Sequence, residues 1–157
     1  MNVGDICNRE VVVALAHETV AAAIDLMRTY HIGDLVVVDQ RGHNNRPIGI
    51  VTDRDILISV VAEKLQPEDI EIGDLMCTDL LTANVSETPF QCLQLMRENC
   101  VRRLPVVDDD EVLQGIVTLD DMLGFLAEQL ADLAVLAQKQ AVQEARRIIP
   151  TRSAILR

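Results

Sequence analysis

The stretch Gly49-Ile50-Val51-Thr52-Asp53-Arg54-Asp55 returns later in the chain as Gly115-Ile116-Val117-Thr118-Leu119-Asp120-Asp121. The similarity extends upstream, where residues 3–39 match the residues that lie 69 positions later. The offset falls to 66 at Gly49, so the connection before the motif is three residues shorter in the second copy. Two copies of one unit, each ending in the same polar motif, predict a tandem repeat with two related sites.

Each copy predicts the element order β-α-β-β-α. Apolar strands are expected at residues 11–13, 35–38 and 48–51, and at residues 80–82, 104–107 and 113–117. Amphipathic helices are expected from about Thr19 to His31 and from about Thr88 to Cys100, with Thr19 and Thr88 in the capping positions. A second helix follows the motif and begins at Asp53 or Leu119. The runs 35–38 and 104–107 are apolar almost throughout, which is typical of strands covered on both faces.

We expect the first repeat at residues 1–66, a linker and the second repeat at 67–129, and a C-terminal helical extension and tail at 130–157. A core is marginal in a repeat of about 60 to 70 residues, so the two copies should pack together. The last helix is predicted to run from about Leu119 to Ile149, where Pro150 ends it. It carries an apolar stripe with the spacing of paired helices: Leu123, Leu126, Leu130, Leu133 and Ala137. Leu123 and Leu126 are expected to pack on the chain's own domain, whereas the stripe beyond Leu130 is expected to pack on a partner helix, most simply one from a second copy.

The formal net charge of −11 argues against binding to nucleic acid or to anionic membranes, because both would be repelled. With no Trp, one Tyr and two Phe, the chain offers no aromatic platform for stacking bases. The charge is uneven, since five basic residues from Lys139 onward stand against Glu144 alone. This basic end fits either contact with an acidic surface or a solvated helix end.

No apolar run reaches the roughly 18 to 20 residues of a membrane span, and no signal peptide is visible. The four cysteines form no CxxC pair, and the three histidines lack ligand spacing with one another or with the thiols. Neither a disulfide framework nor a metal site is therefore predicted. Cys92 and Cys100 are expected to act as small apolar residues of a helix. A cytoplasmic, reducing location is expected.

The Gly-x-x-Thr-x-x-Asp motif has a physical logic of its own. A strand ends and a helix begins within it, so the free N–H groups of the helix attract phosphate. Thr52 and Thr118 place a hydroxyl at this point, and Asp55 and Asp121 place a carboxylate that can accept bonds from a vicinal diol such as ribose. The alternative is a capping box, in which Thr caps the helix and the residue three positions on reaches back to the cap N–H.

Residues 49–57 and 101–118 resemble tandem CBS domains, the Bateman module. The resemblance covers about residues 3–129 and implies a small stand-alone protein of bacterial type. It implies an α/β fold in which two repeats pack through their sheets with pseudo-two-fold symmetry, and modules that pair again as a disc-like homodimer. It also implies clefts that bind AMP, ADP, ATP or S-adenosylmethionine, with Mg²⁺ in some members and no required cofactor.

Carried over to this chain, the resemblance marks one cleft by Thr52 and Asp55 and the other by Thr118 and Asp121. It implies that the opposite repeat completes each cleft. The completing residues are Thr82, Val101, Arg102 and Arg103 for the Asp55 cleft, and Val13, Ile32 and Gly33 for the Asp121 cleft.

The two clefts are expected to differ in charge. Arg54, Arg102 and Arg103 would suit a di- or triphosphate in the Asp55 cleft. The Asp121 cleft instead has Asp120 in the place of Arg54, and Gly33-Asp34 in the place of Arg102-Arg103. It is expected to bind weakly, to bind an adenosine ligand of little charge, or to need a cation. Alternatively, Arg102 and Arg103 are a solvated basic pair at a helix–strand junction.

The resemblance favours an adenosine-nucleotide sensor, a homodimeric regulatory module whose ligand changes its conformation and thereby acts on a partner protein. The alternative is a ligand-free structural or dimerisation module. An enzyme is disfavoured and no catalytic residue is predicted, because the sequence shows no Ser-His-Asp set, Cys-His pair, metal cluster or phosphate loop.

Overall fold

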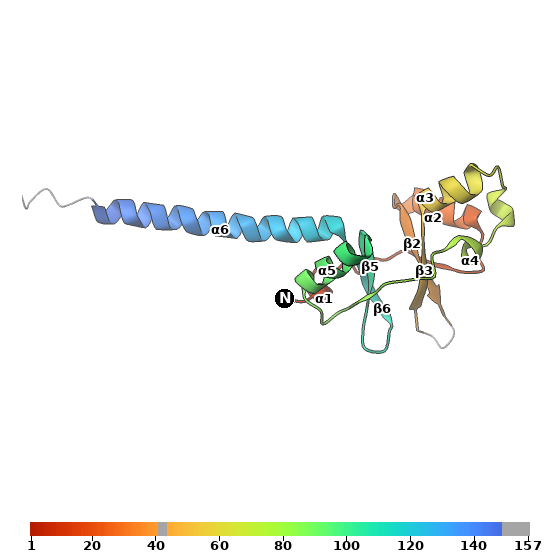
Figure 1. Cartoon of the computed structure of the whole chain (residues 1–157), viewed down its shortest axis with the longest axis horizontal. Helices are drawn as coiled ribbons and strands as arrows, with labels where there is room; N and C mark the ends of the chain where they lie inside the picture. Colours follow the sequence, from red (N-terminus) through yellow and green to blue (C-terminus); the bar gives the residue numbers. More distant parts are fainter. Residues whose placement is uncertain (41–43, 149–157) are drawn as a thin grey trace, which may run out of the picture. The chain divides into compact units, whose positions relative to one another are not determined.

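The structure of the protein, a computed structural model, describes residues 1–40 and 44–148 (Figure 1). It divides into two compact units, Met1–Leu119 and Asp120–Arg157. The first unit holds the strands of both repeats, and the second holds nearly all of the last helix, α6 (Leu119–Ile148). The strands of both copies of the sequence repeat therefore fold within one compact body.

Each repeat contributes one three-stranded sheet, and the two sheets have the same topology. In the first, β1 (Val13–Leu15) runs parallel to β2 (Asp34–Asp39), which runs antiparallel to β3 (Arg46–Thr52). In the second, β4 (Ala83–Asn84) runs parallel to β5 (Arg103–Val107), which runs antiparallel to β6 (Leu113–Thr118). The predicted order of elements and the α/β fold class are confirmed.

The opening strands begin later than predicted, at Val13 and Ala83 rather than at residues 11 and 80. Val11 packs instead against a cluster of buried side chains formed by Val36, Val38 and Ile116. This cluster joins the two repeats, because Ile116 belongs to β6 and the two valines belong to β2. Val11, which suggests an earlier strand, therefore packs between the repeats without pairing in a sheet.

Two matching helices accompany the sheets, α2 (Val20–Tyr30) and α5 (Pro89–Asn99). Thr19 and Thr88 are their N-caps, as predicted, and each hydroxyl accepts a hydrogen bond from the backbone N–H three residues on. Both helices end at a residue in the left-handed conformation, with φ angles of 54° and 55°, at His31 and Cys100.

The second helices of the two repeats differ. In the first repeat, α3 (Asp53–Ile56) continues into a short π-helix, η1 (Leu57–Val61), whereas α6 in the second repeat runs to Ile148. The described residues also form three short elements: α1 (Val3–Ile6), η2 (Pro67–Asp69) and α4 (Ile72–Leu75).

Strand β2 is buried on both faces, as its unbroken apolar sequence predicts. Leu35 and Val37 belong to the core of the first repeat, together with side chains of α2 and α3. Val36 and Val38 point the other way, into the cluster shared with the second repeat. One strand therefore connects the core of its own repeat with the apolar contact between the repeats.

The segments that lead into each repeat cross over to the other one. Just after α1, Asn8 exchanges two backbone hydrogen bonds of 2.9 Å with Ile116 in β6 of the second repeat. Just after α4, Cys77 exchanges backbone hydrogen bonds of 2.9 and 3.2 Å with Ile50 in β3 of the first repeat. The repeats are therefore joined by reciprocal backbone pairing as well as by apolar contact.

The glycine of each motif makes this crossing possible. A Cβ atom at Gly49 would lie 2.6 Å from the Sδ atom of Met76. A Cβ atom at Gly115 would lie 2.7 Å from the Sγ atom of Cys7 and 2.8 Å from the carbonyl oxygen of Asn8. Cβ atoms in proteins essentially never come so close to other atoms, so a side chain here would push the crossing segment away. The glycines therefore serve the contact between the repeats.

Helix α6 ends at Ile148 within the described residues, and the predicted stop at Pro150 lies outside them. Its predicted apolar stripe is open to solvent in the single chain, because Leu123, Leu130 and Leu133 are 56%, 66% and 62% exposed.

We expect Gly115→Ala to lower the free energy of unfolding by about 1–3 kcal/mol, because the added methyl group overpacks the contact with the Asn8 carbonyl. Gly124→Ala is the matched control: no heavy atom lies within 4 Å of the position that its Cβ would take. Because Gly124 lies inside α6, alanine there should raise helix stability by up to about 1 kcal/mol. Chemical unfolding followed by circular dichroism measures both changes, and equal effects would contradict the packing role of Gly115.

The cysteines should differ in reactivity. Cys92 is buried in α5, as predicted, whereas Cys100 is exposed at the end of that helix, contrary to the prediction. Burial, with a smaller effect from the Glu87 carboxylate, raises the pKa of Cys92 to about 11. At a pH of about 8 we therefore expect a thiol reagent to label Cys77 and Cys100 rapidly and Cys92 only on unfolding. A Cys92→Ala variant should lose the slow fraction, and rapid labelling of Cys92 in the native protein would contradict its burial.

Candidate functional site

Two hollows in the first unit are lined by equivalent positions of the two repeats. The hollow that we call the Arg103 hollow has a volume of about 210 Å³ and lies between β3, the segment leading to β4 and the start of β5. The Asp34 hollow has a volume of about 150 Å³ and lies between β6, the segment leading to β1 and the start of β2. Each hollow therefore combines the motif strand of one repeat with two segments of the other.

Nine lining positions of the Arg103 hollow have an equivalent in the Asp34 hollow at the offset of 69 or 66 residues. With the residue of the Arg103 hollow first, they are Ile50/Ile116, Thr52/Thr118, Cys77/Asn8, Asp79/Glu10, Leu80/Val11, Leu81/Val12, Val101/Ile32, Arg103/Asp34 and Pro105/Val36. Most pairs conserve their chemistry: an aliphatic wall, one threonine hydroxyl and one acidic residue. The tandem repeat thus produces two related hollows, as the sequence predicts.

The pair Arg103/Asp34 reverses the charge between the two hollows. In addition, Arg102 lines the Arg103 hollow, and its equivalent in the other repeat is Gly33. Thr52, Val101, Arg102 and Arg103, all predicted for the Asp55 cleft, are thus brought together. The Arg103 hollow can supply two guanidinium groups to an anion, whereas the Asp34 hollow presents carboxylates from Glu10 and Asp34.

Thr52 and Asp55 form the capping box that the sequence allows. The Thr52 hydroxyl accepts a hydrogen bond of 3.2 Å from the Asp55 N–H, while the Thr52 N–H and hydroxyl donate bonds of 2.9 and 2.7 Å to Oδ2 of Asp55. Both bonds to the carboxylate use Oδ2, so Oδ1 has no hydrogen bond from the described residues. Asp55 can therefore cap α3 and still accept a hydrogen bond from a ligand hydroxyl.

Asp34 and Arg103, the first residues of β2 and β5, form an ion pair across the contact between the repeats. The side chains are only 19% and 33% exposed. Burial raises the pKa of the Asp34 carboxyl, the positive charge of Arg103 lowers it, and the negative charge of Asp53 raises it again; the net pKa lies above the ordinary value of 3.8. The carboxylate of Asp34 is therefore desolvated and depends on Arg103 for its compensation.

Other predicted residues take different places. Arg54 is exposed in α3, and neither it nor Asp55 is among the side chains that line the Arg103 hollow. Ile32 and Thr118 line the Asp34 hollow, with Gly33 adjacent to Ile32 in the chain. Asp120 and Asp121 belong to the second unit, where they stand in the first turn of α6.

Thr82 and Val13 are not in the hollows for which they are predicted. Thr82 lines a separate hollow described below, and Val13 lies in β1 and faces the apolar cluster between the repeats. Val13 is part of β1, and the residues just before Val13 and just before Thr82 line the hollows instead. Sequence reasoning missed these residues, which include Leu80, Leu81, Val11 and Val12. Their equivalence in the repeat is the signal that identifies them.

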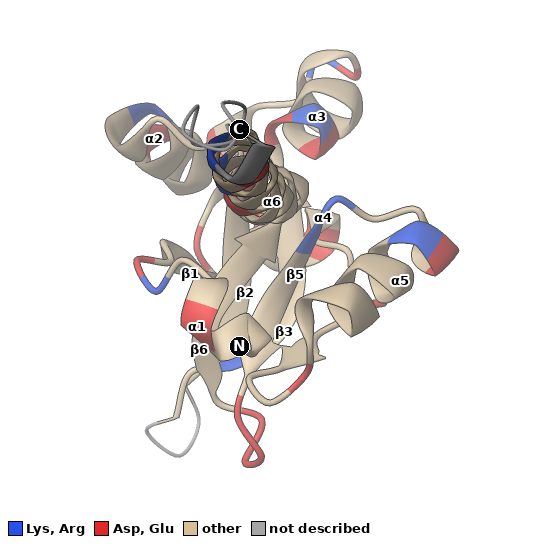
Figure 2. Ribbon diagram, turned by 90° about the vertical axis from the view of Figure 1, so that its left-hand side faces the viewer, with Lys and Arg blue, Asp and Glu red and all other residues tan. Residues whose placement is uncertain are grey.

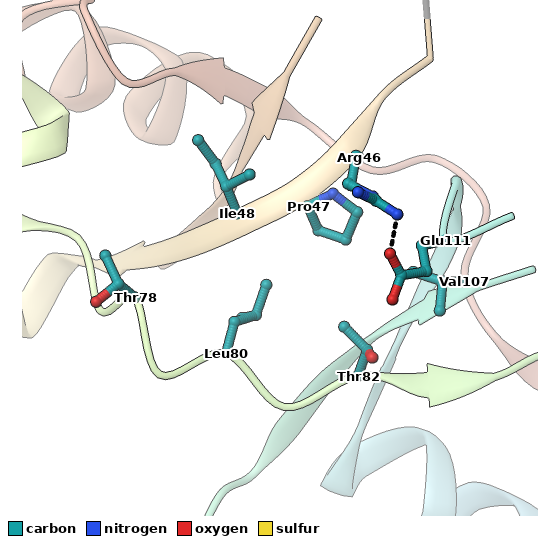
Figure 3. Close-up of a pocket in the computed structure, with 8 residues that line it drawn as sticks. All are labelled: Arg46, Pro47, Ile48, Thr78, Leu80, Thr82, Val107 and Glu111. Atoms are coloured by element: carbon teal, nitrogen blue, oxygen red, sulfur yellow. Dashed lines mark hydrogen bonds and ion pairs between the residues drawn. The ribbon is translucent and has the colours of Figure 1, made fainter. Parts of the chain in front are cut away.

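A third hollow, about 310 Å³ in volume, lies on β3 beside the segment leading to β4 (Figure 3). Arg46 and Glu111 form an ion pair across it, with side chains 56% and 65% exposed. Glu111 comes from the acidic turn of residues 108–111, the red loop between β5 and β6 in Figure 2. An exposed pair contributes little stability. The equivalents of Leu80, Thr82 and Val107 in the other repeat are Val11, Val13 and Val38, which belong to the inter-repeat cluster or pack against it.

Within residues 1–40 and 44–148, no three His, Cys, Asp or Glu side chains are grouped so that they could hold a metal ion. The helices of the same residues include none with the length and apolar character needed to cross a bilayer.

The raised pKa of Asp34 predicts a pH dependence of stability. Because the native state keeps this proton to a higher pH than the unfolded chain, the contribution of Asp34 to the free energy of unfolding falls as pH rises above 3.8 through its raised native pKa. Asp34→Asn lacks this titration, so the stability of the variant relative to wild type should increase as pH rises from 3.8 through the raised native pKa of Asp34. Denaturant unfolding at several pH values measures the difference. A difference between the variant and wild type that does not change with pH would contradict the assignment.

The chain resembles known proteins over most of its length. A protein of Methanopyrus kandleri, uncharacterized protein MK0525, is 34% identical over 123 residues, which are 78% of this chain and 61% of that protein. This chain therefore spans less than two thirds of that relative. Hypoxic response protein 1 of Mycobacterium tuberculosis is 35% identical over 124 residues, 79% of this chain and 84% of that protein.

A solved structure has the same fold. It is the CBS domain pair of protein MJ0100 in complex with 5′-methylthioadenosine and S-adenosyl-L-methionine, which matches with a TM-score of 0.71 and 25% identity over 82% of this chain and 98% of that one. The family model of the CBS domain matches residues 3–62 and again residues 72–128. The two matches coincide with the two copies of the sequence repeat and contain the strands of both sheets. The chain therefore belongs to the CBS-domain family, as a tandem pair of CBS domains.

Proposed function

We propose that the protein is a regulatory module that binds adenosine nucleotides in the hollows between its repeats and acts on a partner protein through a ligand-dependent change of conformation. The observation that carries this proposal is the position-by-position match of the two hollows, each with an aliphatic wall and a motif threonine. Aliphatic side chains can enclose an adenine ring, which suits a chain without tryptophan. The complex of the related CBS pair with two adenosine compounds supports this ligand class.

The Arg103 hollow is the proposed site for a phosphate-bearing nucleotide. Arg102 is exposed and Arg103 is half-buried at its edge, and planar guanidinium groups bind phosphate oxygens in pairs. Asp55 would accept a hydrogen bond from a ribose hydroxyl through Oδ1 while Oδ2 keeps the helix cap. In this proposal the basic pair binds the phosphates at the edge of the hollow, and Asp55, which lies in α3 and not in the lining of the hollow, binds the ribose diol.

The Asp34 hollow is the proposed site for an adenosine compound of low or positive charge. Its equivalents of the two arginines are Asp34 and Gly33, and Glu10 adds a second carboxylate. These groups would repel phosphates unless a cation such as Mg²⁺ intervened. The two hollows of one protein would then bind different ligands.

A ligand-free structural module is the second candidate, and the capping box favours it. The hydrogen bonds of Thr52 and Asp55 are satisfied within α3, so the motif has a structural use without any ligand. Arg102 argues for the nucleotide site, because it lines the Arg103 hollow and neither the helix cap nor the Asp34–Arg103 pair needs it.

We also propose a homodimer, built through the CBS module and through α6. In the first unit, η1 and the residues after it carry four exposed apolar side chains: Leu57, Ile58, Val61 and Leu65, at 59%, 53%, 55% and 50%. In the second unit, α6 carries the exposed stripe that includes Leu130 and Leu133. Exposed apolar patches of this kind mark interaction surfaces.

Two further predictions from the sequence remain: that the protein binds its ligand without catalysing a reaction, and that it is located in the cytoplasm.

Calorimetric titration with adenosine, AMP, ADP, ATP and S-adenosylmethionine, with and without Mg²⁺, tests the proposal. We expect ADP or ATP to bind, and Asp55→Ala to weaken the binding by roughly tenfold or more, because a hydrogen bond to a charged group is lost. Gln91→Ala is the matched control: it removes the equivalent capping box of α5, where Gln91 bonds Thr88 at 2.8 and 2.9 Å. It should cost similar stability and leave the affinity unchanged.

Loss of affinity in both variants would assign the effect of Asp55 to folding. If none of the five compounds binds, the structural module replaces the sensor.

A further inference from the structure

The side chains of Asp34 and Arg103 each line their own hollow and yet bind each other. They occupy the same position in the two repeats, 69 residues apart. Asp34 lines one hollow together with Thr118, and Arg103 lines the other together with Thr52. Their ion pair therefore forms a wall that the two hollows share.

The ion pair keeps the guanidinium of Arg103 engaged while no ligand is bound. Asp34 contacts the Nη1 atom, and both side chains are at least two-thirds buried, so water screens the pair less than it screens an exposed one. Guanidinium groups bind phosphate through two parallel N–H donors, and the Nη1 group that Asp34 occupies is one of the donors on offer. A phosphate in the Arg103 hollow must therefore compete with Asp34.

The competition has a consequence for the second hollow. Asp34 is desolvated, and the neighbouring carboxylate of Asp53 repels it, so its charge is poorly compensated once Arg103 turns away. A carboxylate released in this way faces the hollow that also contains Glu10. That hollow then attracts cations more strongly and repels anions more strongly.

We infer that the Asp34–Arg103 pair couples the two hollows electrostatically, so that Asp34 limits the affinity of the Arg103 hollow for phosphate-bearing ligands. An anion in the Arg103 hollow favours a cationic or uncharged ligand in the Asp34 hollow, and by linkage the reverse also holds. The inference rests on the proposed function for the adenosine part of the ligand, but the competition for Arg103 requires only an anion.

The test compares ADP, adenosine and inorganic pyrophosphate by calorimetric titration of the full chain. Asp34→Asn should tighten the binding of ADP and pyrophosphate by roughly threefold to tenfold, because it removes the competitor of a partly buried pair. Adenosine has no phosphate that could compete for Arg103, so Asp34→Asn should not tighten its binding. In the Arg103→Gln background, Asp34→Asn should have no effect on ADP.

Glu111→Gln is the matched control. It also removes one negative charge from an ion pair between the repeats, that of Arg46 and Glu111, but frees no arginine in the Arg103 hollow. It should change the affinity for ADP by less than Asp34→Asn does. Thermal unfolding of each variant checks that it is folded at the temperature of the titration.

The outcomes separate the coupling from the proposed function. If neither ADP nor adenosine binds but pyrophosphate binds more tightly to Asp34→Asn, the nucleotide function fails and the competition for Arg103 stands. If ADP binds, the coupling is overturned when Asp34→Asn leaves the affinity for ADP unchanged, or when it tightens the binding of adenosine to the same extent. It is also overturned when Glu111→Gln tightens the binding of ADP as much as Asp34→Asn does, or when Asp34→Asn has its full effect in the Arg103→Gln background. Absence of binding by all three probes overturns both.

Discussion

The reciprocal backbone pairing of Asn8 with Ile116 and of Cys77 with Ile50 is the constraint on which the rest of the structure depends. It brings the leading segment of each repeat onto the motif strand of the other, and the glycines of the motif leave room for the crossing. The same residues line the two hollows. The sites therefore exist only because the leading segment of each repeat crosses to the other, and a single repeat would supply only part of each lining.

Because the two repeats are parts of one chain and differ in sequence, equivalent positions can carry opposite charges, which identical subunits of a symmetric dimer cannot do. In a true two-fold dimer, a residue near the axis faces its own copy, and two like charges would repel each other. Here equivalent positions hold Asp34 and Arg103, so the contact is attractive. The two repeats match in their strands and in the apolar lining of their hollows, while the Asp34–Arg103 pair gives the two hollows different charges.

The Thr-x-x-Asp motif illustrates how one arrangement can serve folding and binding together. In α3, Oδ2 of Asp55 completes the helix cap and Oδ1 is left to a ligand. A short helix of four residues that continues as a π-helix gains little from propensity, so its cap matters for its position. The structural and the ligand-binding interpretations of the motif are compatible.

The sequence by itself determined the tandem repeat, the order of the elements, the helix caps at Thr19 and Thr88 and the double burial of β2, because each depends on local periodicity or on residues close in the chain. It also identified Thr52, Val101, Arg102 and Arg103 as neighbours, through the resemblance to a known family. It did not single out Val11, Val12, Leu80 and Leu81 as lining residues, because the starts of β1 and β4 are set by pairing with β2 and β5. Only the tertiary structure decided that Arg103 binds Asp34, since that contact joins residues 69 positions apart whose meeting depends on how the two sheets pack.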